Sequence, residues 1–133
     1  LIDLVDGDAV AFEPLSKAYS IPKDDPNRDQ IMEDALYEAS VVPMSIMETV
    51  LAAAKELEIL VAKGSKLAVS DVGVGILFAQ AAIEGASLNV YINTKSMKDR
   101  ERADEMNAKA DAIIAEGAAL KARIYDGVLA AIK

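Results

Sequence analysis

Residues 71–93, DVGVGILFAQAAIEGASLNVYIN, decide the fold class of this chain. Apolar side chains occupy nearly every face of the helix that they would form, as expected of a helix enclosed by neighbouring helices. Ser70 is suited to cap its first turn, where Asp71 would interact favourably with the helix dipole. We therefore predict a buried central helix over about residues 71–92. The small residues that would let neighbouring backbones approach closely include Gly73, Gly75 and Gly85.

The same stretch is long enough to suggest a membrane span, but its polar residues argue against one. They are Gln80, Glu84, Ser87 and Asn89. A charged group at the centre of a bilayer is costly, so we expect no membrane partner. Gln80 and Glu84 lie one helical turn apart, and we predict that they form a buried structural pair that holds the bundle together.

A second strong pattern follows a polar turn. Residues 97–131 carry small and apolar side chains at alternating steps of three and four, which is typical of a helical bundle or coiled coil. Ser96 and Asp99 resemble a capping box, with Asp in place of Glu. The predicted seam comprises Ala103, Met106, Ala110, Ile113, Gly117, Leu120, Ile124 and Val128.

The sequence of the first half of the chain indicates three further helices, over about residues 2–19, 27–42 and 44–63. Pro43 separates the last two, because the residue before a proline disfavours helical angles. Gly64 stands where a left-handed helix cap is expected. No strand pattern is present, so the predicted fold is an all-α bundle of about five helices with a buried central helix.

One carboxylate lies on an apolar stripe of the first predicted helix. Asp8 shares this stripe, where the spacing calls for a core residue, and this makes it a candidate for function. The alternative is that Gly7 and Pro14 weaken the helix and leave Asp8 solvated near a frayed end. The apolar members of the stripe are Leu1, Val5, Phe12 and Leu15.

Composition narrows the possible functions. The 133 residues suit one domain, over residues 1–133, with a real hydrophobic core. The absence of Cys and His excludes thiol nucleophiles, zinc–thiolate sites and the commonest general base, and we expect no metal site. A net charge of −8 argues against a nucleic-acid partner. No signal peptide is visible, so we expect a cytoplasmic location.

Residues 4–12 (LVDGDAVAF), 21–28 (IPKDDPNR) and 64–93 together resemble the family of formiminotetrahydrofolate cyclodeaminases and methenyltetrahydrofolate cyclohydrolases. The resemblance extends over the whole chain and includes VPMSIME at residues 42–48. It implies an all-helical homodimer that binds a folate substrate and needs no cofactor beyond it. It also implies that a Gly-rich loop and further helices precede Leu1, so that this chain would be the C-terminal two thirds of the domain.

The resemblance implies one of two related reactions. One hydrolyses 5,10-methenyltetrahydrofolate to 10-formyltetrahydrofolate; the other closes formiminotetrahydrofolate and releases ammonia. Both need proton transfers at folate nitrogens, which a carboxylate in a partly dry pocket can perform. We favour the cyclohydrolase, because no formiminotransferase domain is attached. An alternative of another class is a non-catalytic helical dimerisation or scaffold module.

The catalytic candidates that this resemblance implies are the two carboxylates of its Asp-x-Asp motif. Asp8 is the first candidate and Asp6 the second. Residues two apart on a helix point about 200° away from each other, so only one of the pair is expected to face the substrate.

Four further residues are implied as substrate-binding. Asp71 belongs to a Ser-Asp-x-Gly-Val match, although a first-turn acid also stabilises a helix. Asn89 and Asn93 carry amides suited to the edge of a pterin, although either could simply cap the helix. Lys95 is the best candidate for the acidic folate tail, although a solvated surface lysine is the plainer interpretation.

Overall fold

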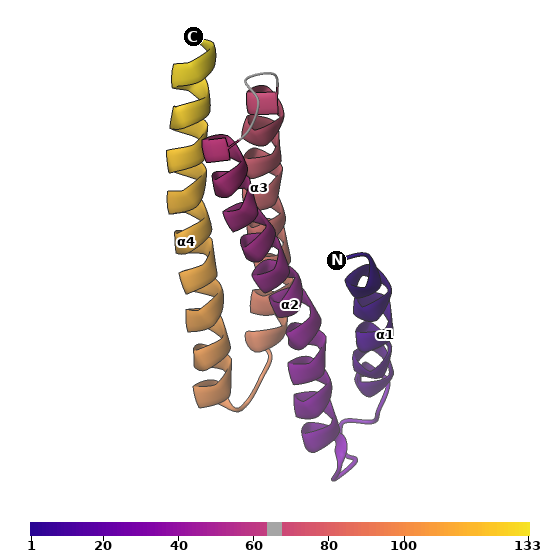
Figure 1. Ribbon diagram of the computed structural model, residues 1–133. Coiled ribbons are helices and arrows are strands. Elements are labelled where there is room, and N and C mark those ends of the chain that lie inside the picture. Colours follow the sequence, from indigo (N-terminus) through magenta and orange to yellow (C-terminus); the bar gives the residue numbers. More distant parts are fainter. Residues whose placement is uncertain (64–67) are drawn as a thin grey trace.

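Four helices make up the computed structural model, which describes residues 1–63 and 68–133 (Figure 1). They are α1 (Ile2–Tyr19), α2 (Arg28–Lys63), α3 (Val69–Thr94) and α4 (Arg100–Ile132). No strand occurs within the two described ranges, which confirms the all-α prediction. The predicted cap at Gly64 lies outside them.

α2 continues through Pro43, so the predicted break is wrong, and four helices rather than about five occupy the described residues. A proline inside a helix offers no N–H to the carbonyl four residues earlier, which here belongs to Ala39. Asn93 on α3 supplies a donor instead, with its side-chain Nδ2 3.1 Å from that oxygen. A partner 54 residues away from Ala39 in the sequence therefore satisfies the carbonyl that Pro43 leaves free.

α2, α3 and α4 run side by side as a three-helix bundle, and α1 packs against the first half of α2 (Figure 1). Only Leu15 and Ala18 of α1 are buried. They join Leu36 of α2 and Ala103 of α4 in one apolar cluster. The C-terminal half of α1 is thus the part that anchors it to the bundle.

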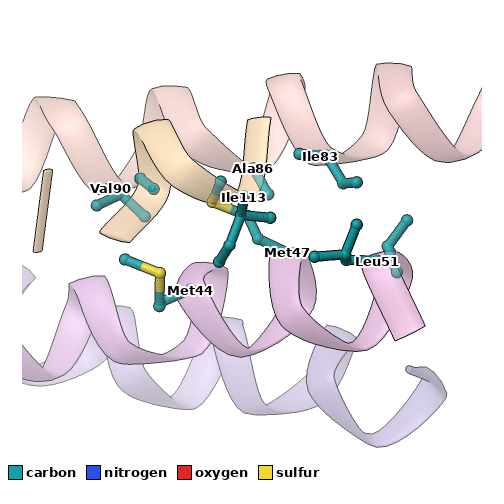
Figure 2. Close-up of a cluster of buried hydrophobic side chains, with 9 residues drawn as sticks. Met44, Met47, Leu51, Ile83, Ala86, Val90 and Ile113 are labelled. Atoms are coloured by element: carbon teal, nitrogen blue, oxygen red, sulfur yellow. The ribbon is translucent and has the colours of Figure 1, made fainter. Parts of the chain in front are cut away.

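The middle of the bundle is a methionine-rich core. In Figure 2, Met44 and Met47 of α2 point toward Ile83 and Val90 of α3, and Ile113 of α4 lies between the two helices. The predicted seam of α4 is confirmed: all its residues are buried except Met106, which is partly buried against the same cluster.

Small residues bring α3 and α4 close together at two points. A Cβ at Gly73 would lie 2.9 Å from Val128 Cγ1, and one at Gly117 would overlap Gln80 Oε1. Gly85 faces open space, so the prediction of a close approach there is wrong. Gln80 is buried and donates to Glu84 Oε1 at 2.8 Å, but Glu84 is itself exposed, so only half of the predicted buried pair is buried.

The side chains of Glu33 and Asp99 fix the turn between α3 and α4 and the start of α4. Glu33 of α2 accepts hydrogen bonds from the backbone N–H groups of Lys98 and Asp99, at 2.7 and 3.1 Å. Asp99 in turn caps α4, because its Oδ1 accepts from the backbone N–H of Arg102 at 3.0 Å. The predicted cap at Ser96 is therefore wrong, since the helix begins only after Asp99.

α3 is covered on one side only, so the prediction that neighbours enclose it is wrong. α2 and α4 pack against one face, and the other face is an apolar stripe open to solvent. The helix begins after Ala68 without a side-chain cap, so Ser70 is not its N-cap. By length and composition α3 could span a membrane, a criterion that core helices of soluble proteins also meet. The exposed stripe comprises Val74, Leu77, Phe78, Leu88 and Ile92.

The apolar stripe predicted for α1 is buried at one end only. Leu15 is buried, whereas Leu1, Val5 and Phe12 are exposed, because the first half of α1 lies against a single neighbouring helix. Asp8 is exposed as well. The four helices thus leave two apolar faces uncovered, one on α1 and one on α3.

Candidate functional site

Three helices meet around a small hollow that contains Asp8. α1 contributes Asp8 and Phe12, which lie four residues apart and so share one face of the helix. α3 contributes Asn89 and Asn93, again one turn apart. The volume of the hollow is about 110 Å³, and Ala39 of α2 and Ile92 of α3 complete its lining.

Asn93 is held at the hollow by its bond to the Ala39 carbonyl, which belongs to a lining residue. A primary amide has two N–H hydrogens and one acceptor oxygen, so this bond occupies only part of its capacity. Asn89 is exposed and adds a second amide beside it. One carboxylate and two amides therefore surround the same small space.

The structure brings together three of the six predicted site residues: Asp8, Asn89 and Asn93. Asp6 is exposed and does not line the hollow, as expected for a residue about 200° around α1 from Asp8.

The other two predicted residues lie elsewhere. Asp71 is exposed in the first turn of α3, about 27 Å along the helix from Asn89 at 1.5 Å per residue. Lys95 is exposed just past the end of α3, close to Asn93 in sequence but outside the lining of the hollow. Neither is gathered with Asp8 within this chain.

Apolar residues also line the hollow, and none of them was predicted as part of the site; they are Phe12, Ala39 and Ile92. Of these, Phe12 and Ile92 each lie within one turn of a predicted polar residue on the same helix. The sequence signal was available, because a residue three or four positions from a site residue shares its face. These side chains would pack against the apolar parts of a ligand.

Tyr91 lies between the two asparagines in the sequence but faces α4. Its hydroxyl donates to Asp111 Oδ1 at 2.5 Å, which ties the C-terminal part of α3 to α4. Burial and the nearby Asp111 carboxylate raise the pKa of Tyr91 to about 12, because both disfavour a phenolate. The bond helps fix the part of α3 that presents the asparagines.

The hollow is open and small compared with complete ligand pockets, which have volumes of roughly 300–1,000 Å³. The partly dry environment expected for Asp8 is not provided by these four helices alone, since its side chain is exposed. The uncovered apolar stripes of α1 and α3 lie on two of the helices that form this hollow.

A larger hollow of about 410 Å³ lies between α2 and α4 and contains none of the predicted site residues. Arg102 stacks over the Tyr37 ring, 3.3 Å from its centroid, and Lys109 pairs with Glu48. Charges of both signs line this surface. Within the part of the chain that the structure describes, no group of three or more carboxylates is close enough to hold a metal ion.

Comparison with known proteins identifies the family. The sequence model described as formiminotransferase-cyclodeaminase matches residues 1–112, which is most of the chain. The chain belongs to the formiminotransferase-cyclodeaminase family. The resemblance inferred from the motifs is thereby confirmed.

Two curated members of the family show how this chain relates to whole proteins. It is 33% identical to a methenyltetrahydrofolate cyclohydrolase of Methylorubrum extorquens, over 96% of this chain and 64% of that protein. It is 31% identical to the formimidoyltransferase-cyclodeaminase of Sus scrofa, over 95% of this chain and 24% of that protein. The chain thus spans less than two thirds of the length of either relative.

A solved structure in the family has the same fold. The formiminotetrahydrofolate cyclodeaminase of Thermotoga maritima superposes with a TM-score of 0.88 at 27% identity, covering 98% of this chain and 63% of that one. The helical arrangement of this chain is therefore that of a family member.

Proposed function

We propose that this chain carries part of the active site of a folate one-carbon enzyme that hydrolyses 5,10-methenyltetrahydrofolate to 10-formyltetrahydrofolate. The observation that carries this proposal is the meeting of Asp8 with Asn89 and Asn93 around one hollow. The similarity to a cyclohydrolase along nearly the whole chain supports it.

The proposed chemistry assigns proton transfer to Asp8. Its carboxylate would stabilise the delocalised methenyl cation and take a proton from the water that attacks the bridging carbon. The resulting tetrahedral centre would collapse by breaking one carbon–nitrogen bond as the carbon–oxygen double bond forms. The proton held by Asp8 would return to the departing folate nitrogen, and the hydroxyl proton would pass to solvent. Asn89 and Asn93 would hold the pterin edge, and Lys95 would meet the acidic tail nearby. The folate substrate is the only small molecule that this scheme requires.

The second candidate is the cyclodeaminase reaction, because relatives of both names align with almost the whole chain. The same carboxylate would take the proton from the folate nitrogen that closes the ring and deliver it to the amino group, which would leave as ammonia. The two candidates are distinguished by giving the protein each substrate in turn. Loss of methenyltetrahydrofolate absorbance supports the cyclohydrolase, and ammonia release from formiminotetrahydrofolate supports the cyclodeaminase. If neither signal appears and the protein binds no folate, the alternative of a non-catalytic scaffold is supported.

We further propose that the enzyme is a cytoplasmic homodimer in which a second copy covers the exposed stripes of α1 and α3. Phe78 is 72% exposed and Leu88 68%, and such apolar faces favour association. Phe78→Lys should then shift the protein from dimer to monomer in light scattering, whereas Ala119→Lys on the exposed side of α4 should not. A monomeric parent protein would refute the dimer.

A further inference from the structure

Pro43 and Asn93 are linked through a single carbonyl oxygen at the wall of the Asp8 hollow. Pro43 has no N–H to give to Ala39, and its ring crowds the carbonyl four residues earlier. Asn93 donates to that carbonyl at 3.1 Å, and both Ala39 and Asn93 line the hollow. In an uninterrupted helix the Ala39 carbonyl oxygen would accept a hydrogen bond from the backbone N–H of residue 43. Here it accepts one from the side chain of Asn93 instead.

This link has a consequence for orientation. An asparagine at an open hollow can adopt several rotamers, and binding a ligand then requires one of them to be selected. With one N–H engaged by Ala39, the amide of Asn93 is oriented before a ligand arrives. An alanine at position 43 would restore the backbone N–H, which would compete with Asn93 for the same acceptor.

We propose that Pro43 is a positioning residue: by freeing the Ala39 carbonyl, it fixes the amide of Asn93 in the orientation that the folate substrate needs. This inference rests on the proposed function of the hollow. The alternative is that Asn93 merely satisfies an orphaned carbonyl and takes no part in binding.

Side-chain amide NMR tests the link without relying on turnover. The Nδ2 hydrogens of Asn93, assigned by their loss in Asn93→Ala, should shift markedly in Pro43→Ala. Pro14→Ala is the matched control, because Pro14 also lies inside a helix but belongs to α1 and is exposed. Unchanged Asn93 signals in Pro43→Ala would overturn the proposal whether or not the protein hydrolyses folate. Pro43→Val, which restores the N–H and keeps an apolar side chain, replaces Pro43→Ala if that variant does not fold.

Kinetics then test whether the orientation matters. Loss of one oriented hydrogen bond should raise KM about tenfold in Asn93→Ala and by a similar factor in Pro43→Ala, with kcat nearly kept. The double variant should be no worse than Asn93→Ala, because both changes remove the same interaction. A multiplied loss of about a hundredfold would show that Pro43 acts independently of Asn93. Absence of turnover in the parent protein would instead count against the proposed function.

Discussion

Gly117 is the position where one added methyl group should test the contact between α3 and α4 most sharply. A Cβ there would overlap the buried Gln80 Oε1 and lie 3.1 Å from Ile83 Cδ1. Gln80 is 5% exposed, and its Nε2 donates to Glu84 Oε1 at 2.8 Å and to the Ile114 carbonyl at 3.4 Å. The amide therefore cannot retreat without losing these bonds.

The magnitude follows from two opposing effects. Overpacking a well-filled interface costs about 1–3 kcal/mol, and disturbing the Gln80 hydrogen bonds adds about 1 kcal/mol. Alanine is more favourable than glycine in a helix by about 1 kcal/mol. Gly117→Ala should thus lower the free energy of unfolding by about 1–3 kcal/mol. Gly127→Ala, on the same helix with nothing within 4 Å of its added Cβ, should raise it by about 0.5–1 kcal/mol.

Urea denaturation followed by far-ultraviolet circular dichroism measures both changes. The free energies of unfolding of the two variants should lie on opposite sides of the parent value and differ from each other by about 1.5–4 kcal/mol. Equal stabilisation of both variants would refute the inference that α3 and α4 approach so closely at Gly117 that only a hydrogen atom fits there.

Two further predictions concern the turn after α3 and the tyrosine that ties α3 to α4. Asp99→Ala should cost about 1 kcal/mol of stability through loss of the N-cap, whereas Ser96→Ala should leave the urea midpoint unchanged; equal effects would contradict the cap assignment. Tyr91 has a folded-state pKa of about 12, above the ordinary 10, so the stability it contributes is complete below pH 10 and is lost as the pH rises toward 12. Thermal melts should therefore show a steeper loss between pH 10 and 12 for the parent protein than for Tyr91→Phe, and identical pH dependence would refute that role.

The sequence predicts best where a pattern is long and local. The seam of α4 repeats over eight positions, and the structure buries it almost completely. The continuity of α2 could not be predicted in this way, because the donor that satisfies Ala39 comes from Asn93 on another helix. The rule that proline interrupts a helix considers only neighbouring residues, so it cannot take account of a hydrogen-bond donor from another helix.

The exposed stripes show a different limit. Apolar spacing on α1 and α3 identifies a face that avoids water, but it does not say which neighbour covers that face. Val5 and Phe78 were expected inside the bundle and lie on its surface. Residues outside these four helices would be needed to bury these two side chains.

The sequence could indicate only part of the lining of the hollow. Asn89 and Asn93 lie one turn apart on α3, so one helix face presents both, and the structure brings them to the hollow that contains Asp8. Asp71 could have been separated from them in advance, because 18 residues of unbroken helix place it about 27 Å away. Only the structure shows that Asp8 of α1 and the C-terminal part of α3 line the same hollow.

The most direct test of the account replaces Asp8 and compares it with its neighbour Asp6. A carboxylate that moves protons in the reaction contributes about 10²–10⁴-fold, so Asp8→Asn should lower kcat for methenyltetrahydrofolate hydrolysis by at least about 100-fold with folding and oligomeric state unchanged. Asp6→Asn removes the same charge two residues away and should change kcat less than about threefold, since its side chain lies outside the hollow. Near-normal turnover in a folded Asp8→Asn variant, or equal losses in both variants, would contradict the claim that Asp8 performs the chemistry.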